Sequence, residues 1–289
     1  MASQLTMLNS MASTDFEKSL EIHRAWGLQW LDLRDAIYGK WVKELDAPTA
    51  RRAQAAIVSA QLRIYCLSTQ TFFDDVSRGE AVFRDHLEQL KLTLQIAPIL
   101  EPQIVRIVAA QLPECEPGAS SVELMKNKYP WVIDVYREAL DAIEQAGFTS
   151  TIENEAKRCF LSRADDFIGF FEWLDRPQTA HLTWDVQNHW STGVFPTLEI
   201  YQQLKPLINY FHTKGGQTDA VADRLAWNVA LEDASWPVRA LTQAVINDGV
   251  SPVICLNPPQ HGEQKSGYDY TDIPKRDVDY LRTNIEGIE

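Results

Sequence analysis

The chain has few basic residues: 27 Lys and Arg stand against 40 Asp and Glu, a net charge of −13 over 289 residues. Nucleic-acid grooves and anionic membrane surfaces need clustered basic side chains, so this balance argues against both as partners. No stretch approaches the roughly 20 consecutive apolar residues of a membrane span. Residues 1–18 also lack the basic start and the apolar run of a secretion signal.

Cysteine is scarce as well, and glycine-rich phosphate motifs are missing. The four cysteines are far apart and show no CxxC spacing, which argues against a disulfide framework or a zinc knuckle and favours a reducing cytoplasm: Cys66, Cys115, Cys159 and Cys255. Neither GxGxxG nor GxxxxGK(S/T) occurs. With 45% apolar and 23% charged residues and no linker-like tract, the sequence predicts one folded domain over residues 1–289.

Short apolar runs alternate with longer amphipathic stretches. The runs are predicted strands: Leu5–Leu8, Trp30–Leu33, Leu62–Leu67, Ile104–Ala109, Phe148–Ile152, Ala180–Trp184, Leu207–Phe211 and Pro252–Leu256. Between them lie predicted helices, most clearly Asp15–Trp26, Trp131–Ala146 and Trp236–Asn247. Ser13-Thr14 is a suitable N-cap for the first of these, and Gly27 a suitable stop.

This alternation predicts an α/β protein with a parallel sheet, because parallel neighbours need long crossovers. Eight strand–helix units of about 36 residues each fit a closed (β/α)8 TIM barrel. A doubly wound open sheet is the rival fold, but it usually has fewer strands and often a glycine-rich turn after the first. The sequence therefore favours the barrel.

Polar side chains stand at the ends of the last four predicted strands. If the bulky residues just before them face the helices, strand alternation turns Glu153, Asp185, His212 and Asn257 into the barrel mouth. Any one of them alone is more simply a solvated acid or a core histidine. Four strand ends that agree on one geometry instead predict a divalent metal site for Mn²⁺, Mg²⁺, Co²⁺ or Zn²⁺.

These residues carry a resemblance to a known family. The segments that carry it, in order and spacing, are Gly27–Arg34, Ile152–Asn154, Asp185–His189, Phe211–Lys214, Leu231–Asp233, Trp236, Asp248–Val250 and Ile254–Leu256. Together they resemble the xylose-isomerase-like barrels, which include sugar isomerases, epimerases, dehydratases and endonuclease IV. The resemblance implies that Glu153, Asp185 and His212 bind the metal. The family's fourth ligand is a glutamate, whereas this chain has Asn257.

The resemblance also implies chemistry. In epimerase-like members two glutamates bind the metal and act as acid and base on opposite faces of the substrate. Glu153 can serve as such a base, whereas the Asn257 amide cannot titrate. A replacement acid could come from Lys214, which shares the inward parity of His212, or from His189 or His261. The family's usual acid after Lys214 is replaced by Gly215.

Several residues are candidate substrate contacts. Asn188 and Arg34 match polar positions of the family, although Arg34 could instead pair with Asp32 or Asp35. Trp190 could stack on a sugar or anchor a loop. Gln111, at the end of the fourth predicted strand, could contact a hydroxyl group, but a surface position is favoured. His189 adjoins these residues, and Gly215-Gly216 could cradle a phosphate or form an ordinary turn.

The leading hypothesis is a metal-dependent isomerase or epimerase of a small sugar, sugar acid or polyol, with a homo-oligomer compatible with the resemblance. A dehydratase or lyase on the same scaffold and a decayed barrel that only binds a carbohydrate are the alternatives. A multi-metal nuclease is disfavoured, because the chain has only six histidines and a net charge of −13.

Overall fold

Eight parallel strands surround the centre of the computed structural model, which describes residues 3–116, 118–155, 158–218, 224–258 and 264–289. The strands are β1 (Gln4–Met7), β2 (Trp30–Leu33), β3 (Arg63–Ser68), β4 (Ile104–Val108), β5 (Thr149–Glu153), β6 (Ala180–Asp185), β7 (Ile208–Thr213) and β10 (Val253–Leu256). They are ordered β1-β10-β7-β6-β5-β4-β3-β2. The end strands meet at a parallel bridge between Leu8 and Asp32, so the barrel is nearly closed.

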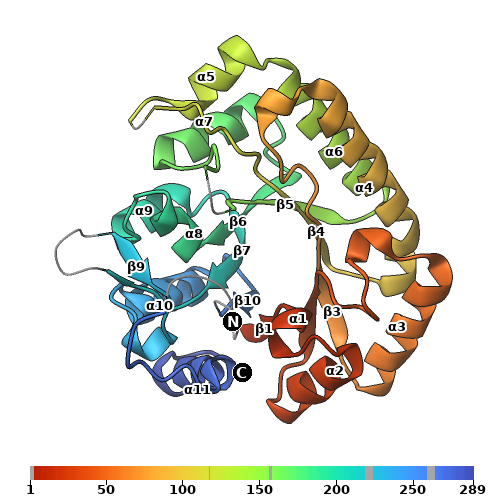
Figure 1. Cartoon of the computed structure of the whole chain (residues 1–289), viewed down its shortest axis with the longest axis vertical. Helices are drawn as coiled ribbons and strands as arrows, with labels where there is room; N and C mark the ends of the chain where they lie inside the picture. The colour runs from red at the N-terminus through yellow and green to blue at the C-terminus, as the bar shows by residue number, and fades with distance from the viewer. Residues whose placement is uncertain (1–2, 117, 156–157, 219–223, 259–263) are drawn as a thin grey trace.

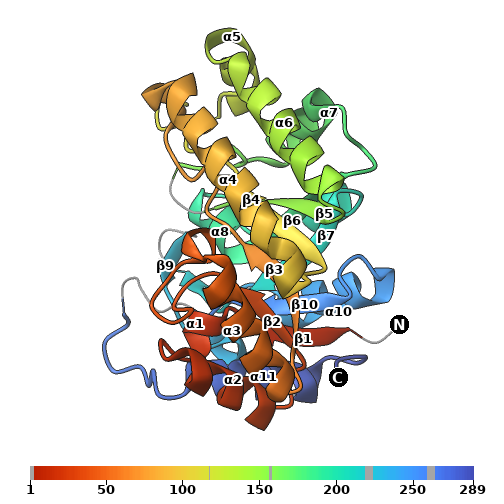
Figure 2. The same cartoon turned by 90° about the vertical axis from the view of Figure 1, so that its right-hand side faces the viewer.

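Helices form an outer ring around the strands (Figure 1). They are α1 (Asn9–Ala12), α2 (Phe16–Ala25), α3 (Ala47–Ser59), α4 (Glu80–Leu100), α5 (Ser121–Lys128), α6 (Trp131–Gln145), α7 (Ala164–Leu174), α8 (Val186–Ser191), α9 (Leu198–Leu204), α10 (Val238–Asp248) and α11 (Ile273–Asn284), with 3-10 turns η1 (Val42–Glu44), η2 (Val76–Arg78) and η3 (Leu231–Asp233). In the side view, both termini lie at the same side (Figure 2), where the Ser3 amide donates to the Gly287 carbonyl. Among the described residues, no helix has the length and apolar character needed to cross a membrane.

The strands are buried on both faces, as expected where helices cover a parallel sheet. Ile152, Trp184, Phe211 and Leu256 belong to the large hydrophobic cluster that joins sheet and helices. Trp184 stacks on Tyr201 of α9, for example, with 6.1 Å between ring centroids. Because side chains alternate along a strand, the residues that follow these four face the barrel interior.

The predicted barrel and its eight strands are confirmed, but local details differ. Helix α2 is capped by Asp15, whose carboxylate accepts from the Lys18 amide, and not by Ser13-Thr14 as predicted. Helix α10 begins at Val238, after Pro237 at the N-cap, and so two residues later than predicted. The hairpin formed by β8 (Gln217–Thr218) and β9 (Leu225–Trp227) was not predicted; its strands are only two and three residues long.

Candidate metal centre

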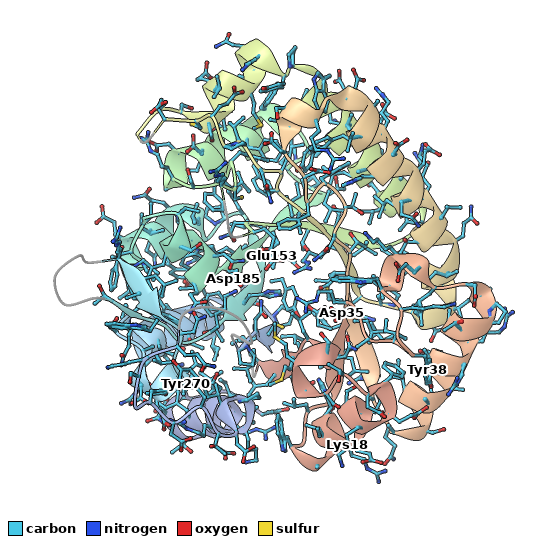
Figure 3. All side chains as sticks on the ribbon, viewed as in Figure 1. Lys18, Asp35, Tyr38, Glu153, Asp185 and Tyr270 are labelled. Atoms are coloured by element: carbon cyan, nitrogen blue, oxygen red, sulfur yellow. The ribbon has the colours of Figure 1, made fainter. Side chains whose placement is uncertain are left out.

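Four strand ends place polar side chains at one end of the barrel. Glu153 and Asp185 are the last residues of β5 and β6, His212 is the penultimate residue of β7, and Asn257 follows β10. Asp185 and His212 are register partners across the β6–β7 ladder. Figure 3 shows Glu153 and Asp185 toward the centre of the ring, with Lys18 and Tyr38 at its outside. The sheet therefore brings together residues that lie far apart in the sequence.

The donor atoms of this group are close to one another. One ligand atom each of Glu153, Asp185 and His212 can be chosen so that all lie within 4.8 Å of one another. Oxygen and nitrogen ligands lie about 2.0–2.2 Å from a zinc ion, so two ligands of one ion are at most about 4.4 Å apart. A small contraction of the group would therefore complete a coordination shell. Such buried groups could bind a metal.

Three buried atoms in the group that could bind a metal make no hydrogen bond within the described residues. Within the described ranges, Glu153 Oε1, His212 Nδ1 and Asn257 Oδ1 have no hydrogen-bond partner. The first two lie 3.1 Å apart, in a geometry that makes no hydrogen bond. Buried polar atoms are normally satisfied, and each exception calls for an explanation. A cation bound by Glu153 and His212 would supply one for the first two atoms, and Asp185 offers a third ligand atom close by, so the residues present fit a divalent metal.

Two protein cations lie within the same group. The Arg106 guanidinium on β4 is hydrogen-bonded to Glu153 Oε2, and both side chains are almost completely buried. Lys214 Nζ lies 2.9 Å from Asp185 Oδ2 and donates to Asn188 Oδ1 at 2.9 Å. Each of the two carboxylates is thus already paired with one cation.

Asp185 is held by several further contacts. Its Oδ1 accepts from the Asn188 amide at 2.8 Å and so caps α8. Its Oδ2 accepts from Asn257 Nδ2 at 3.3 Å and is paired with the Lys214 ammonium. The Asn154 side chain brackets the Asp185 backbone, accepting from its amide and donating to its carbonyl. Asp185 is therefore rigidly placed. To bind a metal, its Oδ2 would have to give up its contact with Asn257 or with Lys214.

His212 lies between two acidic groups. Its Nδ1 faces Glu153, and its Nε2 lies 3.8 Å from Asp32 Oδ2. Asp32 accepts from Ser68 Oγ and from Tyr210 OH, the latter at 2.9 Å. Burial lowers the pKa of His212 well below its usual range, and nearby cations add to the effect. The neutral ring leaves one nitrogen lone pair available for coordination.

The remaining candidate residues fall into different places. Arg34 forms an ion pair with Asp35 at 3.3 Å, which is the structural alternative to a substrate contact, and its side chain donates to Ser10 Oγ. Asn188 contacts Lys214, next to the centre. Gln111 forms backbone bridges to Asp75 and to Cys159, so it joins loops and is only partly buried. His261 lies outside the described residues.

His189 and Trp190 are buried among apolar residues. His189 Nδ1 accepts from Trp184 Nε1 at 3.2 Å, its ring packs on Phe167, and burial lowers its pKa to about 4. Trp190 is 1% exposed and packs edge-on against Phe195. Because Trp184 faces the helices, His189 lies on the outer side of the barrel wall. These placements favour the anchoring interpretation of Trp190 over sugar stacking.

Gly215 and Gly216 lie outside any assigned turn, and the space beside each is restricted. A Cβ at Gly215 would overlap the backbone of Val229 and Ala230, and a Cβ at Gly216 would clash with Leu225 and Gln187. The Gly215 carbonyl accepts from the Gln187 side chain. Gly215 is needed because another backbone segment passes close by, whereas Gly216 lies against side chains.

Sequence reasoning missed two charged residues of the interior, Arg106 and Asp32. Each lies within a short apolar strand, in IVRIV and WLDL, and each is at most 2% exposed. A lone charge inside a buried strand is costly without a partner. A single charged residue at an inward-facing position of an apolar strand could therefore have identified both Arg106 and Asp32 as interior residues.

Comparison with known proteins agrees with this architecture. The profile of the family described as xylose isomerase-like TIM barrel matches residues 21–283. The chain belongs to this family. Among curated proteins, no sequence matches this xylose isomerase-like barrel.

Solved structures resemble the barrel over nearly its whole length. A xylose isomerase-like TIM barrel protein from Mycobacterium smegmatis, in complex with magnesium, is 16% identical, with 98% of this chain and 95% of that chain covered and a TM-score of 0.68. A probable 3-DHS dehydratase from Bacillus anthracis is 15% identical, with 98% and 99% covered and a TM-score of 0.71. D-psicose 3-epimerase from Clostridium cellulolyticum H10, with D-tagatose, is 11% identical, with 99% and 100% covered and a TM-score of 0.71. At these identities the likeness establishes the fold alone.

Proposed function

We propose that this barrel binds a divalent cation through Glu153, Asp185, His212 and Asn257 and isomerises or epimerises a small sugar, sugar acid or polyol. The observation that carries the proposal is that Glu153, Asp185 and His212 can each offer a ligand atom within 4.8 Å of the others. Within the described residues, Glu153 Oε1, His212 Nδ1 and Asn257 Oδ1 make no hydrogen bond. Membership of a family whose solved relatives include a magnesium complex and a sugar epimerase supports it.

Glu153 is the proposed base. Its Oε2 is held by Arg106. Its Oε1 has two lone pairs, so it can contact the metal with one and take a proton from the carbon next to a carbonyl with the other. The bound cation, Mn²⁺, Mg²⁺, Co²⁺ or Zn²⁺, would polarise the neighbouring carbonyl or hydroxyl oxygen and so acidify that C–H bond. The apolar strands around Glu153 exclude water and strengthen these electrostatic effects.

The return of the proton distinguishes the possible reactions. Asn257 has no proton to exchange, so Glu153 either returns the proton itself on the same face, or Lys214 supplies one. Transfer by Glu153 alone fits an isomerisation, in which no carbon needs to be inverted. The Lys214 ammonium also favours a second candidate function, a dehydratase, because it could protonate a departing hydroxyl group.

Metal analysis and hydrogen exchange test the proposal together. Protein purified without chelator should contain divalent metal or take it up when Mn²⁺, Co²⁺ or Zn²⁺ is supplied. It should then exchange a substrate C–H proton with deuterated water. Glu153→Gln should abolish exchange, and Asp185→Asn and His212→Ala should lower metal content. Glu123→Gln, an exposed glutamate on α5, is the matched control.

Two results would contradict the proposal. A wild-type chain that stays metal-free in the presence of all three ions would remove its basis. A chain that is thermally stabilised by sugars or sugar acids but exchanges no proton at saturating metal would instead be a binding barrel. Release of water from a polyol or a hydroxy acid would identify the dehydratase.

A further inference from the structure

The carboxylates proposed as metal ligands are already paired with cations before any metal is bound. Glu153 is paired with Arg106, and Asp185 with Lys214. Nearer the rim, Arg34 is paired with Asp35. The donor that completes the centre, Asn257, is uncharged. The four proposed ligands and their two cationic partners, Arg106 and Lys214, therefore have no net charge.

A divalent cation would bring charge that these residues do not neutralise. The remaining nearby carboxylate, Asp32, faces the other ring nitrogen of His212 and accepts from Ser68 and Tyr210. Even if Asp32 is counted in full, it balances at most half of the added charge. Excess positive charge in a dry, low-dielectric interior is strongly unfavourable without an anion close by. The substrate is the component that can bring one.

Resting on the proposed function, we propose that the substrate is a small hydroxy or keto acid whose carboxylate binds at the metal, and that metal and acid bind cooperatively. A carboxylate with a neighbouring oxygen fills two positions of an ion and neutralises one charge. Lys214 adds a second attraction, since its side chain is 11% exposed and is the less buried of the two cations. A neutral sugar could fill the same positions but would leave the charge unbalanced.

The position of the cations selects a carboxylate over a phosphate ester. Arg106 and Lys214 contact the metal-ligand residues themselves, within one salt bridge of Glu153 and Asp185. The anionic group must therefore lie at the metal. In a sugar phosphate the charge lies on an ester group away from the reacting carbonyl and hydroxyl oxygens.

The test measures Mn²⁺ affinity with matched ligands. Free Mn²⁺ is counted by its electron paramagnetic resonance signal in titrations of the full-length chain with glycerate, glycerol or glycerol 3-phosphate present. Protein-free samples with the same ligands correct for chelation in solution. We expect glycerate to tighten Mn²⁺ binding by about tenfold or more, and Mn²⁺ to tighten glycerate binding by the same factor, since coupling is reciprocal. Glycerol should have no effect, and glycerol 3-phosphate a smaller one than glycerate.

Two variants alter the charge balance directly. Lys214→Gln and Asn257→Glu each make the centre more negative, so each should tighten Mn²⁺ binding in the absence of ligand and reduce the enhancement by glycerate. Lys275→Gln, on α11 and away from the centre, is the matched control without these effects. Thermal unfolding of each variant with and without both ligands gives a second readout and shows that the variant is folded.

The outcomes separate this inference from the proposed function. If Mn²⁺ binds equally well with glycerate and glycerol, or best with the phosphate ester, the inference is wrong while the metal site stands. If Mn²⁺ does not bind even with glycerate present, both are wrong. Glycerate-dependent binding that is unchanged in both Lys214→Gln and Asn257→Glu would show that the charge argument fails.

Discussion

The buried ion pair between Arg106 and Glu153 allows a prediction of stability. Arg106 is 2% exposed and Glu153 fully buried. Glu153→Gln would leave the guanidinium without its counter-charge in the barrel interior. Breaking a buried pair in this way costs about 3–5 kcal/mol. For a chain of this length, that loss corresponds to a fall in the melting temperature of about 5–8 °C.

Urea unfolding in the presence of EDTA measures this cost without a contribution from bound metal. The exposed Glu123→Gln control should cost less than about 1 kcal/mol, since surface pairs contribute little. The double variant Glu153→Gln/Arg106→Met should recover most of the loss, because it removes both charges together. A cost for Glu153→Gln no larger than that of the control, or no recovery in the double variant, would refute the reasoning. The measurement also shows whether Glu153→Gln loses exchange activity because the base is gone or because the fold is weakened.

Two further predictions concern residues away from the metal ligands. Asp277 on α11 is buried and accepts from the Leu231 amide, and burial raises its pKa to about 8. Between about pH 4 and pH 8 the folded state therefore keeps a proton on Asp277 that the unfolded state has released. The free energy of unfolding should fall as pH rises through this range. The urea midpoint of Asp277→Asn should fall less over the same range than that of the wild type. A pH dependence identical in variant and wild type would contradict this assignment. Gly215→Ala would place a methyl group against the Val229 carbonyl and should strongly lower the unfolding temperature, whereas Gly169→Ala, in a helix with space for the methyl group, should not. Equal unfolding temperatures for the two variants would show that the backbone at Gly215 can yield.

The fold was predictable because its signal is repeated. Eight apolar runs, each followed by an amphipathic stretch, predict a parallel sheet wherever the boundaries fall. The strand ends follow from the same pattern, since alternation fixes which residues face inward once Trp184 and Phe211 face the helices. The short hairpin β8–β9 carries no such pattern, because strands of two and three residues have no period to detect.

The electrostatics of the centre could not be predicted in the same way. Ion pairs such as Arg106–Glu153 join different strands, and the sequence does not state which charges meet. The outward position of His189 had a further cause. It follows Asp185 in the sequence, but α8 begins immediately after Asp185, so strand parity no longer applies. The helix turns His189 toward Trp184 and the core.

Asn257 and Lys214 make related contributions to the centre. Both contact the same oxygen, Asp185 Oδ2: Asn257 Nδ2 donates to it at 3.3 Å, and Lys214 Nζ forms an ion pair with it at 2.9 Å. A glutamate at position 257 would replace a donor with a second negative charge and would draw the Lys214 ammonium away from Asp185. The amide at 257 therefore keeps Lys214 bound to Asp185. Because the two residues contact one carboxylate oxygen, their effects on metal affinity should not be additive, and the loss of one carboxylate cannot be judged apart from the lysine beside it.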